Sequence, residues 1–175
     1  IKNGKIYGIG YSAIIEPSIS NMGYVTTALP YQDREKTGHK GGALASTSVS
    51  IGPTGSVYVT CDSLPQGQGH ETILSQIVAD VFGVKLNDIF VNSTNDTHKD
   101  SWSIAAGNYS SRFAGAVAGS AYNAAINLKK KLQKIAASEL NCKSENVLFD
   151  KGKVFDKKNS DNYLKFKRLA GIPHW

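Results

Sequence analysis

One stripe of small and apolar residues constrains the fold of this chain more than any other feature. The stripe recurs at intervals of four and three over residues 114–135, which is the spacing of one helix face. Its members are Ala114, Ala118, Ala121, Ala125, Leu128, Leu132 and Ile135. The first half is built from Ala, with Gly115 and Gly119 beside it, and the second half carries Leu and Ile. The sequence therefore predicts a long helix whose first half approaches another backbone, or a ligand, very closely.

Turn-forming residues divide the rest of the chain. Gly52-Pro53-Thr54-Gly55 separates two alternating runs, at 43–51 and 56–60, and predicts a β-hairpin. Asp150-Lys151-Gly152 separates two short apolar runs in the same way and predicts a second hairpin.

Weaker patterns predict the remaining elements. Apolar residues at helical spacing over 73–82 predict a second helix that Gly83 ends, with a short strand at 89–91 beyond it. Residues 6–16 mix glycine with β-formers and predict a strand, whereas residues 17–42 predict an irregular excursion. Residues 164–170 predict the start of a further helix.

Together these elements predict an α+β fold with a mixed β-sheet, hairpins and two main packed helices. We expect residues 1–175 to form a single segment in three parts. Residues 1–42 hold the first strand and the excursion, residues 43–140 hold the first hairpin, two polar loops and both helices, and residues 141–175 hold the second hairpin and a partial helix.

Composition and charge exclude several classes of protein. Hydrophobic residues make up 41% of the chain and charged residues 19%, which is typical of a globular fold and too apolar for disorder. The net charge of +6 comes largely from two lysine clusters that predict solvated faces, so we expect no nucleic-acid partner. Cys61 and Cys142 make no disulfide framework, and no apolar run is long enough to span a membrane. No signal peptide is visible, and a cytoplasmic location is expected, with the periplasm left open.

The segment from Pro65 to Thr72 is the first candidate ligand site. A strand enters it, Gly67 and Gly69 remove side chains from the turn, and a helix leaves it. This arrangement gathers backbone N–H groups and the positive end of a helix dipole, while Gln66 and Gln68 add amide donors and acceptors. It suits an anionic ligand rich in heteroatoms, although a plain strand-to-helix turn is the simpler interpretation.

Sharper motifs fail at this segment. Position 72 is Thr, so the GxGxxG fingerprint is incomplete, and no Gly-Lys-Ser/Thr ending marks a P-loop. His70-Glu71 begins like a zinc-protease motif, but position 74 is Leu, and His39, His98 and His174 have no ligand spacing. A lone histidine such as His70 more often caps or packs at a helix start than acts in catalysis, and no metal ligand is expected in this chain.

The segment from Gly107 to Phe113 is the second candidate. It is a polar loop that leads into the small-residue end of the long helix, with hydroxyls, an amide and Arg112 in reach of an anion. The simpler interpretation is an N-cap, with Ser110 or Ser111 satisfying free N–H groups and Arg112 on the surface. Two such loops in one chain favour a shared phosphate-bearing ligand. No catalytic set is visible, since the acids are scattered and no nucleophile–base pair is suggested.

Both segments closely resemble the molybdopterin-binding subunit of the xanthine dehydrogenase and aldehyde oxidase family, which includes carbon monoxide dehydrogenase-like members. The block Ser63-Leu64-Pro65-Gln66-Gly67-Gln68-Gly69-His70-Glu71-Thr72 is similar to the family's Gln-Gly-Gln-Gly-His motif. Ser110-Ser111-Arg112 followed by Ala118-Gly119-Ser120-Ala121 resembles its second cofactor loop and helix, in the same order. Glu16-Pro17-Ser18-Ile19-Ser20-Asn21-Met22-Gly23 also resembles a branch of the family, so the resemblance covers nearly the whole chain.

The resemblance implies a set of residues around a molybdenum-pyranopterin cofactor, or its cytosine-dinucleotide form. The expected cofactor-binding residues are Gln66, Gly67, Gln68, Gly69, His70, Asn108, Tyr109, Ser110, Ser111, Arg112 and Phe113. Phe113 departs from the small or hydroxyl residue common in the family, which puts a hydrogen bond from that residue in doubt. No catalytic residue is expected in this chain, because the family's general-base glutamate and its metal-side Gly-Gly-Phe-Gly loop have no match here.

The resemblance also implies partners and an activity. The chain would be a split-gene subunit or an internal fragment, joined by the rest of the molybdenum subunit, an iron–sulfur subunit with 2Fe–2S centres and a subunit with FAD. The enzyme would oxidise an aldehyde, an N-heterocycle or a similar small substrate with water as the oxygen source, and the fragment alone would be inactive. An alternative is a non-catalytic binding or assembly module that keeps the loops. A weaker one is a polyanion-binding domain, for which the sequence shows no pattern of interleaved aromatics.

Overall fold

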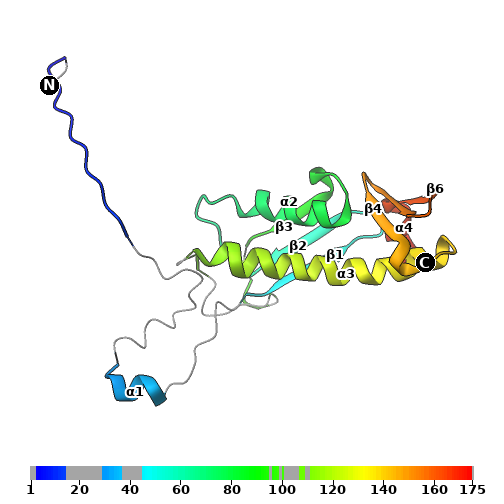
Figure 1. Cartoon of the computed structure of the whole chain (residues 1–175), viewed down its shortest axis with the longest axis horizontal. Helices are drawn as coiled ribbons and strands as arrows, with labels where there is room; N and C mark the ends of the chain where they lie inside the picture. Colours follow the sequence, from blue (N-terminus) through cyan, green and yellow to red (C-terminus); the bar gives the residue numbers. More distant parts are fainter. Residues whose placement is uncertain are drawn as a thin grey trace.

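A computed structural model describes residues 3–14, 29–36, 45–94, 96–98, 100, 107–108 and 111–174 of the chain. The chain forms two three-stranded sheets, and helices pack on them (Figure 1). The α+β class predicted from the sequence is confirmed, with the strands divided between two sheets instead of gathered in one.

The first sheet is mixed and contains the predicted hairpin. Strands β1 (Thr47–Ile51) and β2 (Val57–Cys61) are antiparallel, and the turn between them is closed by a 2.9 Å bond from the Gly55 N–H to the Gly52 carbonyl. Strand β3 (Ile89–Asn92) lies parallel to β2. Because parallel neighbours need a crossover, helix α2 (His70–Phe82) returns the chain between them and makes a βαβ unit.

Helix α2 ends where the sequence predicted. Gly83 adopts a left-handed conformation (φ 61°), and its N–H and that of Val84 both donate to the Ala79 carbonyl. A short 3-10 turn, η2 (Leu86–Asp88), then leads into β3.

The long helix begins with an irregular turn. A π-helical turn, η4 (Phe113–Val117), precedes α3 (Ala118–Glu139) and fits one extra residue into the first turn. Ala121, Ala125 and Leu132 are buried as the stripe predicted. Ala114 is exposed, contrary to the predicted stripe, because the wider turn rotates it out of phase.

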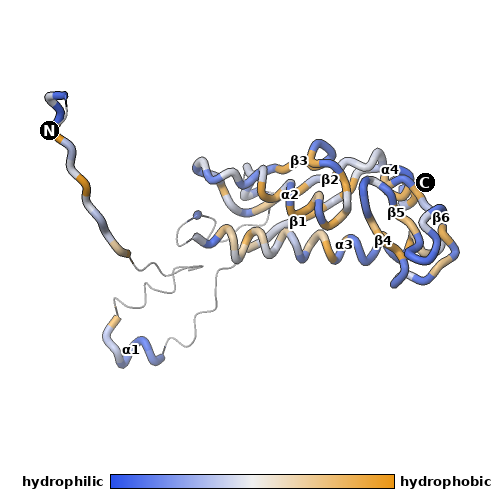
Figure 2. The backbone as a smooth tube through the Cα atoms, turned by 45° about the horizontal axis from the view of Figure 1, so that its top comes forward, coloured by the Kyte–Doolittle hydropathy of each residue, from blue (hydrophilic) through white to orange (hydrophobic). Residues whose placement is uncertain are grey.

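The core lies between one face of the first sheet and the two helices. Val57, Val59 and Cys61 point from β2 into it, where Leu74 and Val78 of α2 meet them, and α3 packs against both α2 and β1. Full burial of a Val or Leu side chain contributes about 1.5–3 kcal/mol. Figure 2 shows the resulting amphipathic pattern, with hydrophobic and hydrophilic residues alternating along α3.

The second sheet lies at the far end of α3. Strands β4 (Val147–Asp150) and β5 (Lys153–Asp156) form the second predicted hairpin, and β6 (Asn159–Lys165) adds a third antiparallel strand. Helix α4 (Phe166–Gly171) follows it, and the 3-10 turns η5 (Ser144–Asn146) and η6 (Ile172–His174) flank this unit. The predicted helix at 164–170 is therefore confirmed, with its start shifted to Phe166.

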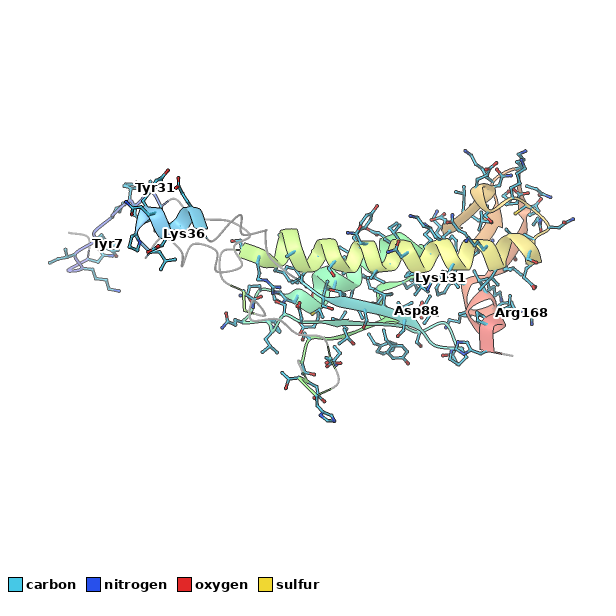
Figure 3. The ribbon with its side chains drawn as sticks, turned by 90° about the horizontal axis from the view of Figure 1, so that it is seen from below. Tyr7, Tyr31, Lys36, Asp88, Lys131 and Arg168 are labelled. Atoms are coloured by element: carbon cyan, nitrogen blue, oxygen red, sulfur yellow. The ribbon has the colours of Figure 1, made fainter. Side chains whose placement is uncertain are left out.

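The N-terminal part of the chain departs from the sequence predictions. Residues 6–14 form no strand, although one was predicted for 6–16, and residues 15–16 lie outside the described residues. Large side chains there, such as Ile9 and Tyr11, are more than four-fifths exposed. Within the predicted excursion at 17–42, a short helix, α1 (Tyr31–Lys36), is found, and residues 17–28 and 37–42 are not among the described residues. Figure 3 shows Tyr7, Tyr31 and Lys36 lying apart from the two-sheet body.

Candidate functional site

Two loops meet at one end of the first sheet. One loop follows the carboxyl end of β2 and leads into α2, and the other follows the carboxyl end of β3 and leads into η4 and α3. The N-terminal ends of both helices therefore lie at the same end of the molecule, away from the second sheet (Figure 1). In sheets with parallel strands, the carboxyl ends of the strands are where ligands usually bind.

The first loop enters α2 through two left-handed glycines. Gly67 has φ 98° and Gly69, the N-cap residue, has φ 75°; no side chain caps the helix. A Cβ at either glycine would meet no atom of the described residues within 4 Å, so none of these residues fills the space above the loop. The free N–H groups of the first helical turn can therefore meet an approaching group, and the positive end of the helix dipole favours an anion there.

The two glutamines of this loop are exposed, as a contact with a ligand requires. The Gln68 side chain is turned back on its own loop, where its Oε1 accepts a hydrogen bond of 2.5 Å from the Gln66 N–H. This bond fixes the shape of the turn and leaves the Gln68 amide NH₂ as a donor toward solvent.

His70, the first residue of α2, is fully buried. Its ring stacks on the Phe113 ring with 3.8 Å between centroids and 7° between planes. Neither ring nitrogen has a hydrogen-bond partner of good geometry among the described residues, although the backbone of Ser63 lies nearby. Burial lowers the pKa of His70, against the opposing effects of that backbone and Glu71, so the ring is neutral at physiological pH.

Glu71 fixes the first turn of α2 to the chain beyond β3. The Ser93 hydroxyl donates a 2.5 Å hydrogen bond to its Oε1, and this bond lowers the pKa of the Glu71 carboxyl. A carboxylate in the first turn also complements the helix dipole.

The second loop is bound directly to the first. The Ser63 hydroxyl donates to the Asn108 Oδ1 at 2.7 Å, and the Asn108 amide donates to the Leu64 carbonyl. Ser111 follows in a left-handed conformation (φ 51°), which is uncommon for a residue with a side chain and concentrates at functional sites. Tyr109 and Ser110, which the sequence also placed here, lie outside the described residues.

Arg112 is buried, so the interpretation that placed it on the surface is wrong. Its side chain is fully covered and turned inward, because a buried carboxylate of opposite charge lies there: Nη2 is 3.8 Å from the Asp62 Oδ1. Its Nη1 donates to the Gly107 carbonyl at 3.3 Å. The N-cap of η4 is Arg112, whose own side chain makes no cap hydrogen bond. The interpretation of Ser110 or Ser111 as an N-cap stays a prediction, since Ser110 lies outside the described residues.

The buried polar side chains of the described residues gather at this one end of the fold. They are Asp62, Ser63, His70, Ser93 and Arg112. Burial of polar groups is unfavourable unless partners compensate for lost water, so such a concentration is typical of a functional site. Sequence reasoning missed Asp62, Ser63 and Ser93. Their positions in the sequence could have identified them, because each is one of the first two residues after an apolar strand.

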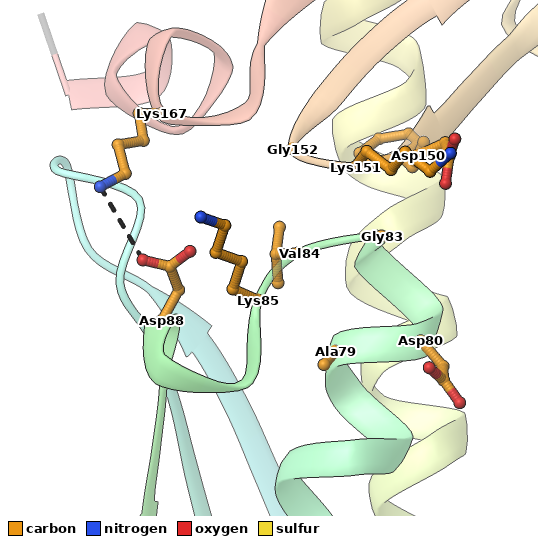
Figure 4. A pocket seen from close by; sticks show the side chains of 11 residues that line it. Ala79, Asp80, Gly83, Val84, Lys85, Asp88, Asp150, Lys151, Gly152 and Lys167 are labelled. Atoms are coloured by element: carbon orange, nitrogen blue, oxygen red, sulfur yellow. Dashed lines mark ion pairs between the residues drawn. The ribbon is translucent and has the colours of Figure 1, made fainter.

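One cleft lies elsewhere and contains none of the predicted site residues. It has a volume of about 670 Å³ and lies between the C-terminal end of α2 and the second sheet, with Lys85, Asp88, Lys151 and Lys167 among its lining. Figure 4 shows the ion pair of 3.8 Å that joins Lys167 and Asp88 across it.

Among the described residues, no group of three or more His, Cys, Asp or Glu side chains could hold a metal ion. The helices in the described part of the chain include none long and apolar enough to cross a bilayer.

Comparison with known proteins extends these findings. Residues 2–175 match the sequence model of the family described as "Molybdopterin cofactor-binding domain". The nicotine 6-hydroxylase large subunit of Paenarthrobacter nicotinovorans is 30% identical over 151 residues, covering 86% of this chain and 17% of that protein. The carbon monoxide dehydrogenase large chain of Afipia carboxidovorans is 32% identical over 125 residues, covering 71% of this chain and 15% of that protein.

Solved structures give the same result. Quinoline 2-oxidoreductase from Pseudomonas putida 86 is similar with a TM-score of 0.68 and 32% identity, over 75% of this chain and 16% of that one. The chain thus spans about a sixth of the length of the proteins it matches.

Proposed function

Because this chain belongs to the molybdopterin cofactor-binding domain family, we propose that it holds a molybdenum-pyranopterin cofactor as one part of a larger oxidoreductase. The observation that carries the proposal is the meeting of two loop-to-helix junctions around His70 at the carboxyl ends of β2 and β3. The family's cofactor carries phosphate, and a helix N-terminus with free N–H groups is a ready-made phosphate site.

The residues of the first loop fit such a group. The open space above Gly67 and Gly69 allows close approach to the backbone, and the uncapped first turn of α2 offers N–H donors to phosphate. The two buried ring nitrogens of His70, without good partners among the described residues, would be satisfied by heteroatoms of a bound ligand. Gln66 and Gln68 would add amide contacts from the exposed rim of the loop.

The second loop would close the site from the other side. Asn108 is hydrogen-bonded to the first loop. On the resemblance to the family, Tyr109, Ser110 and Ser111 would be further cofactor contacts. Arg112 would act from within the protein, through the backbone that its guanidinium fixes. Phe113 stacks on His70 and would help to keep water from the ring, whose pKa is lowered by burial.

These roles separate what the cofactor would contribute to the reaction from what this chain would contribute. The bound group would supply the two-electron oxidation of substrate with water as the oxygen source. This chain's residues would bind and orient the group, hold neutral hydrogen-bonding partners at its edges and keep water away. No described residue is arranged as a nucleophile or general base toward this site, so the proton-transfer groups would belong to the rest of the molybdenum subunit.

The substrate class and partners follow from the relatives. Their names include nicotine 6-hydroxylase, quinoline 2-oxidoreductase and carbon monoxide dehydrogenase, which favours a small molecule such as an N-heterocycle or an aldehyde as substrate. The partners would be the remaining molybdenum-subunit polypeptide, a 2Fe–2S subunit and an FAD subunit, in the cytoplasm. We favour the cytosine-dinucleotide form of the cofactor on the similarity to the carbon monoxide dehydrogenase large chain.

The experiment that tests this function compares two glycines. Gly69→Ala and Gly152→Ala both place a side chain at a left-handed residue with no atom within 4 Å, but only Gly69 faces the proposed cofactor. In the full-length protein, purified with its natural partners, Gly69→Ala should lower the content of molybdenum and pterin at least fivefold, and Gly152→Ala should leave it unchanged. Equal content in both variants would contradict the proposed site. A wild-type preparation without either component would indicate a non-catalytic binding or assembly module.

A further inference from the structure

Two buried opposite charges lie between the proposed cofactor loops. Asp62 is 1% exposed and directly follows β2, and Arg112 is fully buried at the start of η4. The Nη2 and Oδ1 atoms are 3.8 Å apart, which is longer than a hydrogen bond, so the pair is held mainly by charge. No expectation drawn from the sequence gave Asp62 a role.

Arg112 connects three parts of the site. One nitrogen of its guanidinium faces the Asp62 carboxylate at the base of the first loop, and another donates to the Gly107 carbonyl of the second loop. The planar, forked guanidinium holds these two directions at a fixed angle, which a lysine could not do. The residue after Arg112 is Phe113, whose ring covers His70. Movement of the Arg112 head group would therefore displace the Gly107 carbonyl.

General stability does not explain the presence of this pair. A buried ion pair is often no more stabilising than a well-packed apolar pair of similar volume, because both charges must leave water. Burial raises the pKa of Asp62, against the opposing effects of the Ser46 backbone and the Arg112 guanidinium. No hydrogen bond of good geometry reaches its carboxylate from the described residues. A fold that needed only packing here would be served as well by apolar side chains.

We propose that Asp62 is a positioning residue that holds Arg112, and through it Gly107 and Asn108, against the 63–70 loop so that both sides face one ligand. This inference rests on the proposed function, since the ligand in question is the pyranopterin cofactor. The bonds from Ser63 and Asn108 join the outer parts of the same two loops. Asp62 and Arg112 join their buried bases.

The test separates positioning from folding with three variants of the full-length protein in its natural complex. Asp62→Asn keeps the side-chain shape and removes the charge. The double variant Asp62→Leu with Arg112→Met removes both charges and replaces them with apolar groups. Val147→Ala opens a cavity in the buried core at the far end of α3 and lowers stability without touching the loops.

The measured quantities are the thermal midpoint and the rate at which molybdenum and pterin are lost during dialysis. Asp62→Asn should lose the cofactor at least tenfold faster than wild type. Val147→Ala should lose it at a rate within twofold of wild type, even if its thermal midpoint falls as far as that of Asp62→Asn. The double variant should recover the midpoint of the wild type but still lose the cofactor tenfold faster. The inference is overturned if the double variant recovers both the thermal midpoint and the slow cofactor loss of the wild type. It is also overturned if the rate of cofactor loss rises in proportion to the fall in midpoint in all three variants.

Failure of the underlying function would look different. A wild-type complex that contains neither molybdenum nor pterin would overturn the proposed function and this inference together. If the wild-type complex contains the cofactor and Asp62→Asn loses it no faster, only the role of Asp62 is overturned.

Discussion

The substitution Gly83→Ala should disrupt the contact between α2 and the second sheet. Gly83 ends α2 in a left-handed conformation, and a Cβ there would stand 2.8 Å from both the Asp150 Cα and the Phe149 carbonyl oxygen. Both atoms belong to backbone, so neither can rotate away as a flexible side chain would. The Gly83 carbonyl also accepts a 2.6 Å hydrogen bond from the Gly152 N–H, which holds the β4–β5 hairpin in place.

The expected loss of stability can be assembled from these contacts. The left-handed conformation costs an alanine about 1–2 kcal/mol. Displacement of the hairpin adds about 1–3 kcal/mol for overpacking, and the weakened hydrogen bond adds about 1 kcal/mol. The total is about 4 kcal/mol, which lowers the melting temperature of a unit of this size by roughly 10 °C.

Gly152→Ala is the matched control. Gly152 is also left-handed (φ 74°), but a Cβ there meets nothing within 4 Å, so only the conformational strain of about 1–2 kcal/mol remains. Differential scanning calorimetry of the purified protein would measure both midpoints. If Gly83→Ala lowered the midpoint no more than Gly152→Ala, the close approach of α2 to the hairpin would be refuted.

Three further predictions concern side chains near the helices. Because burial lowers the pKa of His70 below its ordinary 6.5, the folded protein binds fewer protons than the unfolded chain just below that pH, so stability should fall as the pH drops from about 7 to about 5. His70→Gln should flatten this fall in urea unfolding measured across that range; an unchanged slope would contradict the buried neutral ring. Phe113→Ala should uncover His70 and speed its modification by diethyl pyrocarbonate at least fivefold by peptide mass spectrometry, while Phe113→Leu should react almost as slowly as wild type. Lys129→Met should lower the free energy of unfolding in urea by about 1–2 kcal/mol, because Lys129 donates a 2.6 Å hydrogen bond to the Val81 carbonyl in the last turn of α2. Lys131→Met changes an exposed residue of the same helix as Lys129, α3, and should lower it by less than about 0.5 kcal/mol.

Local chemistry made some elements predictable from the sequence. The two hairpins were confirmed because their turns carry glycines whose conformational demands are set within four residues. The end of α2 was confirmed for the same reason at Gly83. Periodic apolar spacing identified both main helices, but it could not anticipate the π-helical turn that exposes Ala114.

Elements that depend on distant partners were harder to predict. Strand β6 was missed because its residues Asn159–Lys165 are mostly polar and exposed, and its conformation comes from pairing with β5. The opening strand was predicted from β-forming residues, but residues 6–14 pair as no strand in the structure. Propensity alone does not make a strand without a neighbour.

The site divides in the same way. The two loops could be located from their glycines and hydroxyl residues, because the helix starts are local features. Asp62 and the inward turn of Arg112 could not, because each depends on a residue from another loop. The stacking of Phe113 on His70 is a tertiary contact of the same kind.

Metal and pterin analysis of the native protein tests the central claim most directly. The protein would be purified from its source with everything that accompanies it, and molybdenum would be measured by mass spectrometry alongside pterin released by oxidation. We expect about one molybdenum and one pterin per chain, in a complex that also carries iron and flavin. A folded, intact preparation with neither molybdenum nor pterin would contradict it, and the two loops would then belong to a protein that holds no such cofactor.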